Sequence, residues 1–226
     1  MPSISPVRAL GEELLSFLLA ACCAGCQQPE TLLCADCLDE LRPRPVSVRT
    51  PAGLAVRAAL PFESVAARCI RRLKDDGETL LARPLGRALA VTLHEAHAEA
   101  DGMLTVPVPT SRSSFRRRGY RVPELLLRRA GAPATRLLSV ARAGADQRDL
   151  DATQRAHNVH GRMRSVGSGL GQPVVLVDDI VTTGSTLDEA ARALDAAGFR
   201  VVTAVTLAAT PRHSERTVNT WGTRSK

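Results

Sequence analysis

The stretch that decides the fold reads Val174-Val175-Leu176-Val177-Asp178-Asp179-Ile180-Val181-Thr182-Thr183-Gly184-Ser185-Thr186. Its first four residues are apolar and mostly β-branched, and they follow the chain breaker Gly171-Gln172-Pro173. This pattern predicts a buried strand of a parallel sheet. Apolar residues then recur at helical spacing from Leu187 to Ala197, so a polar loop and a helix are expected after the strand.

The loop between the expected strand and helix consists of small hydroxyl residues around a glycine, from Thr182 to Thr186. A loop of this kind at a helix N-terminus offers unpaired backbone N–H groups, hydroxyl donors and the positive end of the helix dipole. Such groups hold a phosphate well. We therefore predict a ligand that carries a phosphate monoester.

Asp178 and Asp179 are adjacent acids at the expected end of the strand. Neighbouring carboxylates repel each other unless hydroxyl donors or a cation satisfy them. A ribose 2,3-diol with Mg²⁺ nearby would do both. The alternative is an ordinary strand-to-helix turn in which one acid or one hydroxyl caps the helix. That alternative explains one residue of the run, but not the whole of it.

Residues 174–186 resemble the phosphoribosyl-pyrophosphate (PRPP) motif of the type I phosphoribosyltransferases at every position. In that family the acid pair holds the ribose hydroxyls and the loop holds the 5-phosphate. The resemblance implies that Asp178 and Asp179 are catalytic and that PRPP binds together with Mg²⁺. The PRPP-binding positions that it implies are Asp178, Asp179, Ile180, Val181, Thr182, Thr183, Gly184, Ser185 and Thr186.

The composition allows one α/β domain with a small appendage in 226 residues. The formal charge of +7 is carried almost entirely by arginine, since Lys74 and Lys226 are the only lysines. This balance favours anionic partners such as phosphorylated metabolites, nucleic acid or acidic proteins. With one Trp, one Tyr and four Phe, few rings can stack single-stranded bases, so any nucleic-acid binding should be weak and electrostatic.

Near the N-terminus, Leu14 to Ala21 is apolar and leads to Cys22 in a box like that of bacterial lipoproteins. However, Glu12 and Glu13 stand where a secretory signal carries positive charge. The apolar run is also too short to span a bilayer. We therefore predict an amphipathic helix over residues 7–20, no membrane anchor and a cytoplasmic location.

Two Cys-x-x-Cys knuckles follow, Cys23-Ala24-Gly25-Cys26 and Cys34-Ala35-Asp36-Cys37, separated by seven residues. Paired knuckles can place four thiolates tetrahedrally around one Zn²⁺. Disulfides are disfavoured without an export signal, and a redox-active pair would need a thioredoxin-like setting. We predict a structural zinc site at Cys23, Cys26, Cys34 and Cys37, with Cys22 as an alternative ligand.

Between the knuckles and the PRPP motif, the patterns predict a linker and then regular elements. Leu41 to Pro51 is punctuated by prolines and predicts the linker. Leu54 to Phe62 predicts a strand, and Ser64 to Lys74 and Leu80 to Ala100 predict helices. His94 and His97 have no evident third metal ligand, and we expect them on the surface; Cys69 should be a small core residue.

The next informative stretch, from Leu104 to Thr110, predicts a short strand that opens into an arginine-rich loop. Guanidinium groups there would stabilise a pyrophosphate leaving group as the C1–O bond breaks. A solvated basic loop or a nucleic-acid contact explains the composition equally well, but the position after a neighbouring strand favours pyrophosphate. The predicted pyrophosphate loop comprises Thr110, Ser111, Arg112, Arg116, Arg118 and Gly119.

Residues 141–163 lack hydrophobic periodicity, and loops this long are usually functional or disordered. We predict a mobile hood that closes over the ribosyl centre and keeps water from PRPP. Its expected polar groups are Gln147, Arg155 and Asn158.

Nearly the whole chain resembles the ComF (competence protein F) family of amidophosphoribosyltransferase-like proteins. The resemblance is carried by the double knuckle, Arg71-Arg72-Leu73-Lys74, Val106-Pro107-Val108-Pro109, Arg118-Gly119-Tyr120, Gln147 with Arg155 and Asn158, and residues 174–186. Where that family continues Arg-Gly-Phe-Asn-Gln, this chain has Arg121 and Val122 after Tyr120. The difference removes two side-chain amides beside the pyrophosphate loop, which bears on catalysis rather than on phosphate binding.

The resemblance implies an α/β chain with a type I phosphoribosyltransferase fold, a parallel sheet flanked by helices and a small N-terminal zinc-binding segment with four cysteine ligands. The expected divisions are residues 1–45 for the helix and knuckle, 52–210 for the phosphoribosyltransferase domain and 211–226 for a disordered tail. The implied reaction displaces pyrophosphate from PRPP with an unidentified nitrogen acceptor, and the family name implies a link to competence and DNA uptake. The rival interpretation is a non-catalytic PRPP sensor or DNA-binding accessory protein. A dimer is one option for the oligomeric state.

Overall fold

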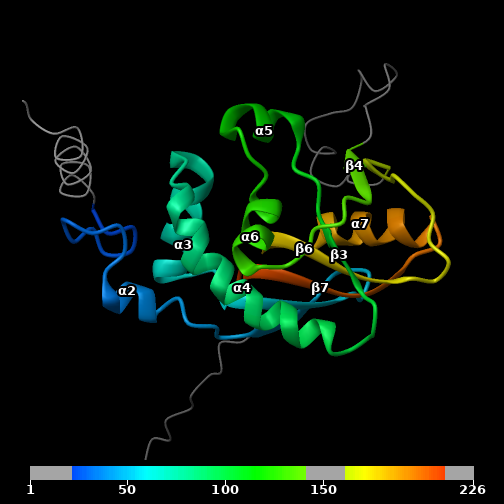
Figure 1. The fold of residues 1–226 in the computed structure, drawn as a ribbon, viewed down its shortest axis with the longest axis horizontal. Helices are drawn as coiled ribbons and strands as arrows, with labels where there is room; N and C mark the ends of the chain where they lie inside the picture. The colour runs from blue at the N-terminus through cyan, green and yellow to red at the C-terminus, as the bar shows by residue number, and fades with distance from the viewer. Residues whose placement is uncertain (1–21, 141–160, 212–226) are drawn as a thin grey trace, which may run out of the picture.

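A computed structural model describes residues 22–140 and 161–211 of the chain. Its centre is a five-stranded sheet with the strand order β1-β2-β7-β6-β3 (Figure 1). The strands of this sheet are β1 (Val46–Arg49), β2 (Ala55–Pro61), β3 (Leu104–Pro107), β6 (Pro173–Val181) and β7 (Arg200–Ala209). Four of them pair in parallel, and β1 adds an antiparallel edge. The predicted parallel sheet is confirmed, with one antiparallel strand added.

Helices cover both faces of the sheet (Figure 1). The helices of the described residues are α2 (Ala35–Asp39), α3 (Ser64–Arg71), α4 (Ala82–His97), α5 (Arg112–Arg118), α6 (Val122–Ala130) and α7 (Ser185–Asp195). Successive side chains of β6 alternate between the faces. Val175 and Val177 join a core cluster with α3, α4 and α6, whereas Val174 and Leu176 join a second cluster with α7.

Strand β6 contains the predicted strand and continues beyond it. Residues 174–177 are fully buried, as their apolar run predicted. The strand extends to Val181 because the long neighbouring strand β7 keeps pairing with it, up to the partners Val181 and Ala209. Asp178 and Asp179 therefore lie within the last part of β6, and the strand continues two residues past them to Val181.

The prediction of a linker over Leu41 to Pro51 is wrong for β1, which pairs with β2. Val46 and Val48 are partly buried against the core, and Ser47 and Arg49 are exposed. This alternation is that of an edge strand with one covered face. The prolines around it hid the pattern, because only four residues of the strand lie between them and the following turn.

The predicted helices differ from the observed ones at their ends. Helix α3 is followed by the π-helix η1 (Arg72–Asp76), which ends at Gly77 with a φ of 76°. The next predicted helix starts as the 3₁₀-helix η2 (Thr79–Leu81) before α4. A small antiparallel ribbon of β4 (Leu138–Val140) and β5 (Met163–Ser165) was not predicted, since strands of three residues leave little pattern.

Several predictions lie outside the described residues: the helix over residues 7–20, the hood residues Gln147, Arg155 and Asn158, and the tail from residue 212 onward. The division of the chain into residues 1–45, 52–210 and 211–226 stays a prediction. Within the described ranges, no helix combines the length and the apolar character needed to cross a membrane. Cys69 is fully buried in the core, which confirms its predicted place.

Candidate active site

The acid pair lies at the C-terminal end of β6, where its neighbour β3 also ends. Pro107 pairs with Val177, and the N–H of Val108 donates to the carbonyl of Val177 at 2.8 Å. The chain that follows β3 therefore leaves the sheet beside Asp178. Clefts for ligands of open α/β sheets form at this edge. The parallel pairing thus brings two predicted parts of the site, the acid pair and the start of the arginine-rich segment, to one place.

Both carboxylates of the pair have defined contacts. Asp178 Oδ1 accepts a hydrogen bond of 2.8 Å from the N–H of Asp179. The two carboxylate oxygens of Asp179 each lie 3.0 Å from Nζ of Lys74. The sequence patterns had not assigned Lys74 to the site.

Burial, and next the charge of Asp179, raise the pKa of Asp178 to about 8, against smaller opposing effects of the Asp179 N–H and Lys74. Burial and the neighbouring charge therefore disfavour the ionised form of Asp178 when no ligand is present. A cation or a set of hydroxyl donors would favour its ionised form. The residues fit a hard cation such as Mg²⁺, which takes carboxylate oxygens as ligands.

The hydroxyl-rich loop turns from β6 into the N-terminus of α7. The N–H of Ser185 donates to Thr183 Oγ1 at 3.4 Å, and the two hydroxyls lie 3.2 Å apart. Gly184 has a φ of 87°, and a Cβ there would lie 2.8 Å from the side chain of Thr50. Glycine is thus required twice, by the backbone conformation and by the close approach of Thr50. Because α7 starts at Ser185, the loop meets the positive end of its dipole.

The arginine-rich segment is helix α5, so the prediction of a loop is wrong for residues 112–118. Ser111 caps the helix by accepting from the N–H of Ser114 at 3.2 Å, and Gly119 ends it with a φ of 79°. The segment has almost no apolar residues, and none of α5 is buried. Hydrophobic periodicity could not reveal this helix, whereas its two caps could have.

The predicted pyrophosphate residues lie in three different settings. Thr110 and Arg112 line a cleft of about 210 Å³ between the end of β3, α6 and β4. Arg116 is exposed on α5. Arg118 is only 11% exposed, and its Nε donates to the backbone carbonyl of Lys74 at 2.7 Å. Arg118 therefore supports the chain around Lys74, and the role of the whole group toward pyrophosphate stays a prediction.

Lys74 is the residue that the sequence patterns missed. It stands in the π-helix η1, and such widened turns are frequent at functional sites. The available signal was compositional, because Lys74 is one of only two lysines in an arginine-rich chain. Its contact with Asp179 spans 105 positions of the sequence, so no local pattern could show it.

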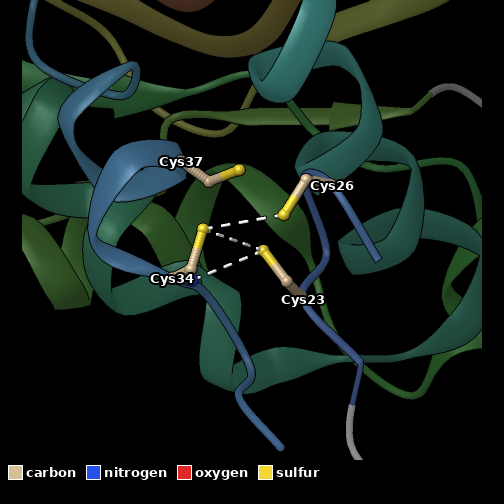
Figure 2. Close-up of side chains that lie close together, drawn as sticks. All are labelled: Cys23, Cys26, Cys34 and Cys37. Carbon is tan, nitrogen blue, oxygen red and sulfur yellow. Dashed lines mark hydrogen bonds between the residues drawn. The ribbon is translucent and has the colours of Figure 1, made fainter. Parts of the chain in front are cut away.

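The four knuckle cysteines converge, as Figure 2 shows, and their Sγ atoms all lie within 4.8 Å of one another. Sγ of Cys34 is 3.7 Å from that of Cys23 and 3.6 Å from that of Cys26. Four thiolates about 2.3 Å from a tetrahedral zinc lie about 3.8 Å apart, so the cluster fits the ion. These four cysteines could hold a metal ion, and Cys22 is not among them.

Local contacts shift the pKa values of the cluster in opposite directions, because the pKa of Cys23 is lowered whereas those of Cys26 and Cys37 are raised. Burial raises the pKa of the Cys23 thiol, but hydrogen bonds from the backbone N–H groups of Cys26, Cys34 and Gly25 outweigh it and lower the pKa to about 6. A Cβ on Gly25 would lie 2.4 Å from Sγ of Cys37. The first knuckle therefore needs glycine at this position, because any side chain would collide with Cys37.

Of the two histidines on α4, His94 is exposed as expected. His97 is half-buried, and Nε2 lies 2.8 Å from Oγ1 of Thr105 on β3. This bond ties α4 to the sheet. Neither histidine belongs to a group of metal-ligating side chains in the part of the chain that the structure describes.

Residues 116–223 match the family model of the phosphoribosyl transferase domain. The matched segment, just under half of the chain, is similar to phosphoribosyltransferase domains. It includes the acid pair, the hydroxyl-rich loop and α7. It leaves out the knuckles, β2 and the π-helix that carries Lys74. None of the curated proteins matches the chain.

Solved phosphoribosyltransferase structures are similar to the chain. Adenine phosphoribosyltransferase from Saccharomyces cerevisiae is 18% identical, with a TM-score of 0.38, over 78% of this chain and 89% of that one. Orotate phosphoribosyltransferase from Aeropyrum pernix is 18% identical, with a TM-score of 0.33, over 76% and 77%. The allosteric regulatory enzyme of purine biosynthesis is 21% identical over 56% of this chain, which spans only 26% of its length, with a TM-score of 0.35. At these identities and TM-scores, the likenesses establish neither substrate nor activity.

Proposed function

We propose that the protein is a ComF-like phosphoribosyltransferase that binds PRPP with Mg²⁺ and displaces pyrophosphate with a nitrogen nucleophile. One observation carries the proposal: a half-buried acid pair at the end of β6 is followed directly by a hydroxyl-rich loop at the N-terminus of α7. The two features lie inside the segment that matches the phosphoribosyl transferase family. Together they suit a ligand that carries both a sugar diol and a phosphate.

The loop would hold the 5-phosphate of PRPP. Backbone N–H groups at the start of α7, the hydroxyls of Thr183 and Ser185 and the helix dipole all favour an anion there. Thr182 and Thr186 are further hydroxyl donors of the same loop. The left-handed Gly184 lets the backbone turn toward such a ligand.

The acid pair would accept hydrogen bonds from the ribose hydroxyls. Mg²⁺, when bound with PRPP, supplies positive charge that the carboxylates of Asp178 and Asp179 hold near the sugar. Charge on the two carboxylates also stabilises the cation-like C1 centre that develops when pyrophosphate leaves. No side chain has to attack C1, since the acceptor nitrogen does so.

The segment that follows β3, with its arginines, would bind the pyrophosphate leaving group. Thr110 and Arg112 line the cleft beside the end of β3, and Arg116 projects from the exposed face of α5. Guanidinium groups stabilise pyrophosphate as it departs. The hood residues Gln147, Arg155 and Asn158 would then exclude water from the ribosyl centre.

We also propose that the four knuckle cysteines bind one structural Zn²⁺. Four thiolates complete the coordination of zinc and leave no position for a substrate. The knuckle would therefore stabilise the fold, and the proposed chemistry would stay at the end of β6.

A non-catalytic PRPP sensor or DNA-binding accessory protein of DNA uptake is the second candidate. One observation favours it: Arg121, which stands where the ComF pattern has an amide, stacks over the ring of Phe115 at 4.8 Å. The exposed arginines of α5 lie close by and could meet phosphates of nucleic acid. In this alternative, PRPP binds but no acceptor displaces pyrophosphate.

The test is pyrophosphate release from PRPP and Mg²⁺ in the presence of a panel of nucleobases and amines. We expect at least one acceptor to release pyrophosphate in the wild-type protein and not in Asp179→Asn. Binding of PRPP without release for any acceptor would favour the sensor. Failure to bind PRPP at millimolar concentration would contradict the phosphoribosyltransferase proposal altogether.

A further inference from the structure

We propose that Lys74 is a built-in counter-cation of the acid pair: it competes with the divalent cation for Asp179 and moves onto the phosphate oxygens of PRPP when PRPP and Mg²⁺ bind. The second half of this inference rests on the proposed function. The first half concerns only Lys74, Asp179 and a metal ion, and it can be tested without PRPP.

The contact between Lys74 and Asp179 uses the atoms that a metal would need. Nζ lies 3.0 Å from both carboxylate oxygens, and the two side chains are only 22% and 14% exposed. An ion pair this far from solvent is weakly screened by salt. A divalent cation cannot take Asp179 as a ligand at full strength while the ammonium group occupies both oxygens.

The backbone around Lys74 is held in place by a different part of the site. Arg118 Nε donates to the carbonyl of Lys74 at 2.7 Å, and the hydroxyl of Tyr120 donates to the carbonyl of Leu73. Both partners follow or end α5, the helix of the predicted pyrophosphate residues. Two consecutive carbonyls of the π-helix therefore accept hydrogen bonds from the end of α5 and the residues just after it.

These hydrogen bonds fix the backbone of Lys74 but leave its ammonium group free to move. The side chain has four rotatable bonds, and its ammonium group is a compact charge that can exchange one anion for another. Because its backbone touches the α5 region and its Nζ touches β6, Lys74 stands between the predicted places of pyrophosphate and ribose. A short swing would carry its charge from Asp179 toward the leaving group.

Other charges near Lys74 have partners of their own. Arg72 forms an ion pair with Glu78, and Asp75 lies 3.8 Å from Arg117 and 3.9 Å from Arg118. These contacts hold segment 72–78 together without using the acid pair. Replacing Lys74 therefore changes the charge at Asp179 more than it changes the rest of the segment.

The test measures binding of Mn²⁺ alone, and of PRPP with Mg²⁺, to the zinc-loaded protein. Lys74→Met keeps most of the side-chain length but removes the charge, and Lys74→Arg keeps the charge. We expect Lys74→Met to bind Mn²⁺ about tenfold more tightly than wild type, and PRPP with Mg²⁺ about tenfold more weakly, which is within the usual range of coupling between two sites. Arg42→Met, which removes an exposed cation just after α2 and outside segment 72–78, should leave Mn²⁺ binding unchanged.

Opposite shifts for the metal and for PRPP are the diagnostic result, because a lysine with a purely structural role would weaken both. In an Asp179→Asn background, Lys74→Met should have no further effect on Mn²⁺ binding. Equal or weaker Mn²⁺ binding in Lys74→Met, with unchanged zinc content and thermal midpoint, would overturn the counter-cation role. If wild type binds no PRPP, the proposed function fails, and the Mn²⁺ comparison still decides the role of Lys74 toward Asp179.

Discussion

The most informative single change is Asp178→Asn, because it isolates the effect of burying an acid beside another acid. Burial, followed by the charge of Asp179, raises the pKa of Asp178 to about 8 in the folded protein, whereas an aspartate in an unfolded chain has a pKa of about 4. Below pH 4 the carboxyl group of Asp178 is protonated in the folded and the unfolded state, so it does not change the free energy of unfolding. As the pH rises, the unfolded chain releases the proton first, so the stability of the folded protein falls between about pH 4 and pH 8.

The size of this effect follows from the same pKa difference. Each pH unit in that window lowers the free energy of unfolding by up to about 1.4 kcal/mol, which gives a loss of at most about 4 kcal/mol at pH 7. Water penetration and relaxation around the pair reduce the cost. We expect Asp178→Asn, which keeps the shape and the acceptor for the Asp179 N–H, to gain about 2 kcal/mol over wild type at pH 7. For a domain of this size, the gain raises the midpoint of thermal unfolding by about 4 to 8 °C.

The assay is thermal unfolding of both proteins from pH 5 to pH 8.5, in buffer without Mg²⁺ and with the zinc bound. The difference between the two midpoints should widen steadily with pH. Asp75→Asn, which removes an exposed acid of segment 72–78, serves as the control. Its thermal midpoint should change with pH in the same way as that of wild type. Parallel curves for wild type and Asp178→Asn would refute the raised pKa of Asp178 in the folded protein.

Three further predictions concern ligands of the wild-type protein. PRPP with Mg²⁺, at a hundred times its dissociation constant, should stabilise the fold by about 2.7 kcal/mol and raise the midpoint by roughly 5 to 10 °C. Asp178→Asn should lose most of this shift, and a shift that persists would mean that the ribose lies elsewhere. Elemental analysis should find one zinc per chain, and Gly25→Ala or the pair Cys34→Ser and Cys37→Ser should lose it; equal zinc content in the variants would count against the site. Affinity for single-stranded DNA should fall steeply with salt in a filter-binding titration, and a tight, salt-insensitive complex would favour the DNA-binding alternative.

The sequence predicted those parts of the molecule whose pattern is local and continuous. The apolar run from Val174 to Val177 is buried on both faces, and such a run needs no information from elsewhere in the chain. The two knuckles bring four sulfur atoms together because each Cys-x-x-Cys pair is a turn in itself. The hydroxyl-rich loop follows its strand directly, so its place was predicted as well.

Other parts depended on signals that hydrophobic periodicity does not contain. Strand β1 has four residues, and prolines precede it, so its alternation was too short to outweigh them. Helix α5 buries nothing, and only the hydroxyl of Ser111 and the left-handed Gly119 mark its ends. The contact of Lys74 with Asp179 required the π-helix, which no propensity predicts.

The contacts of segment 72–78 connect the knuckle with the acid pair. Arg72 Nη1 donates to the carbonyl of Cys22 at 3.1 Å, and two residues later Lys74 holds Asp179. Cys23 and Cys37 also belong to the same core cluster as Val175 and Val177 of β6. The knuckle is thus packed into the core that carries the site, and loss of the proposed zinc would loosen the side of the core on which η1 rests. The proposed zinc would in this way affect the proposed binding of PRPP without touching the ligand.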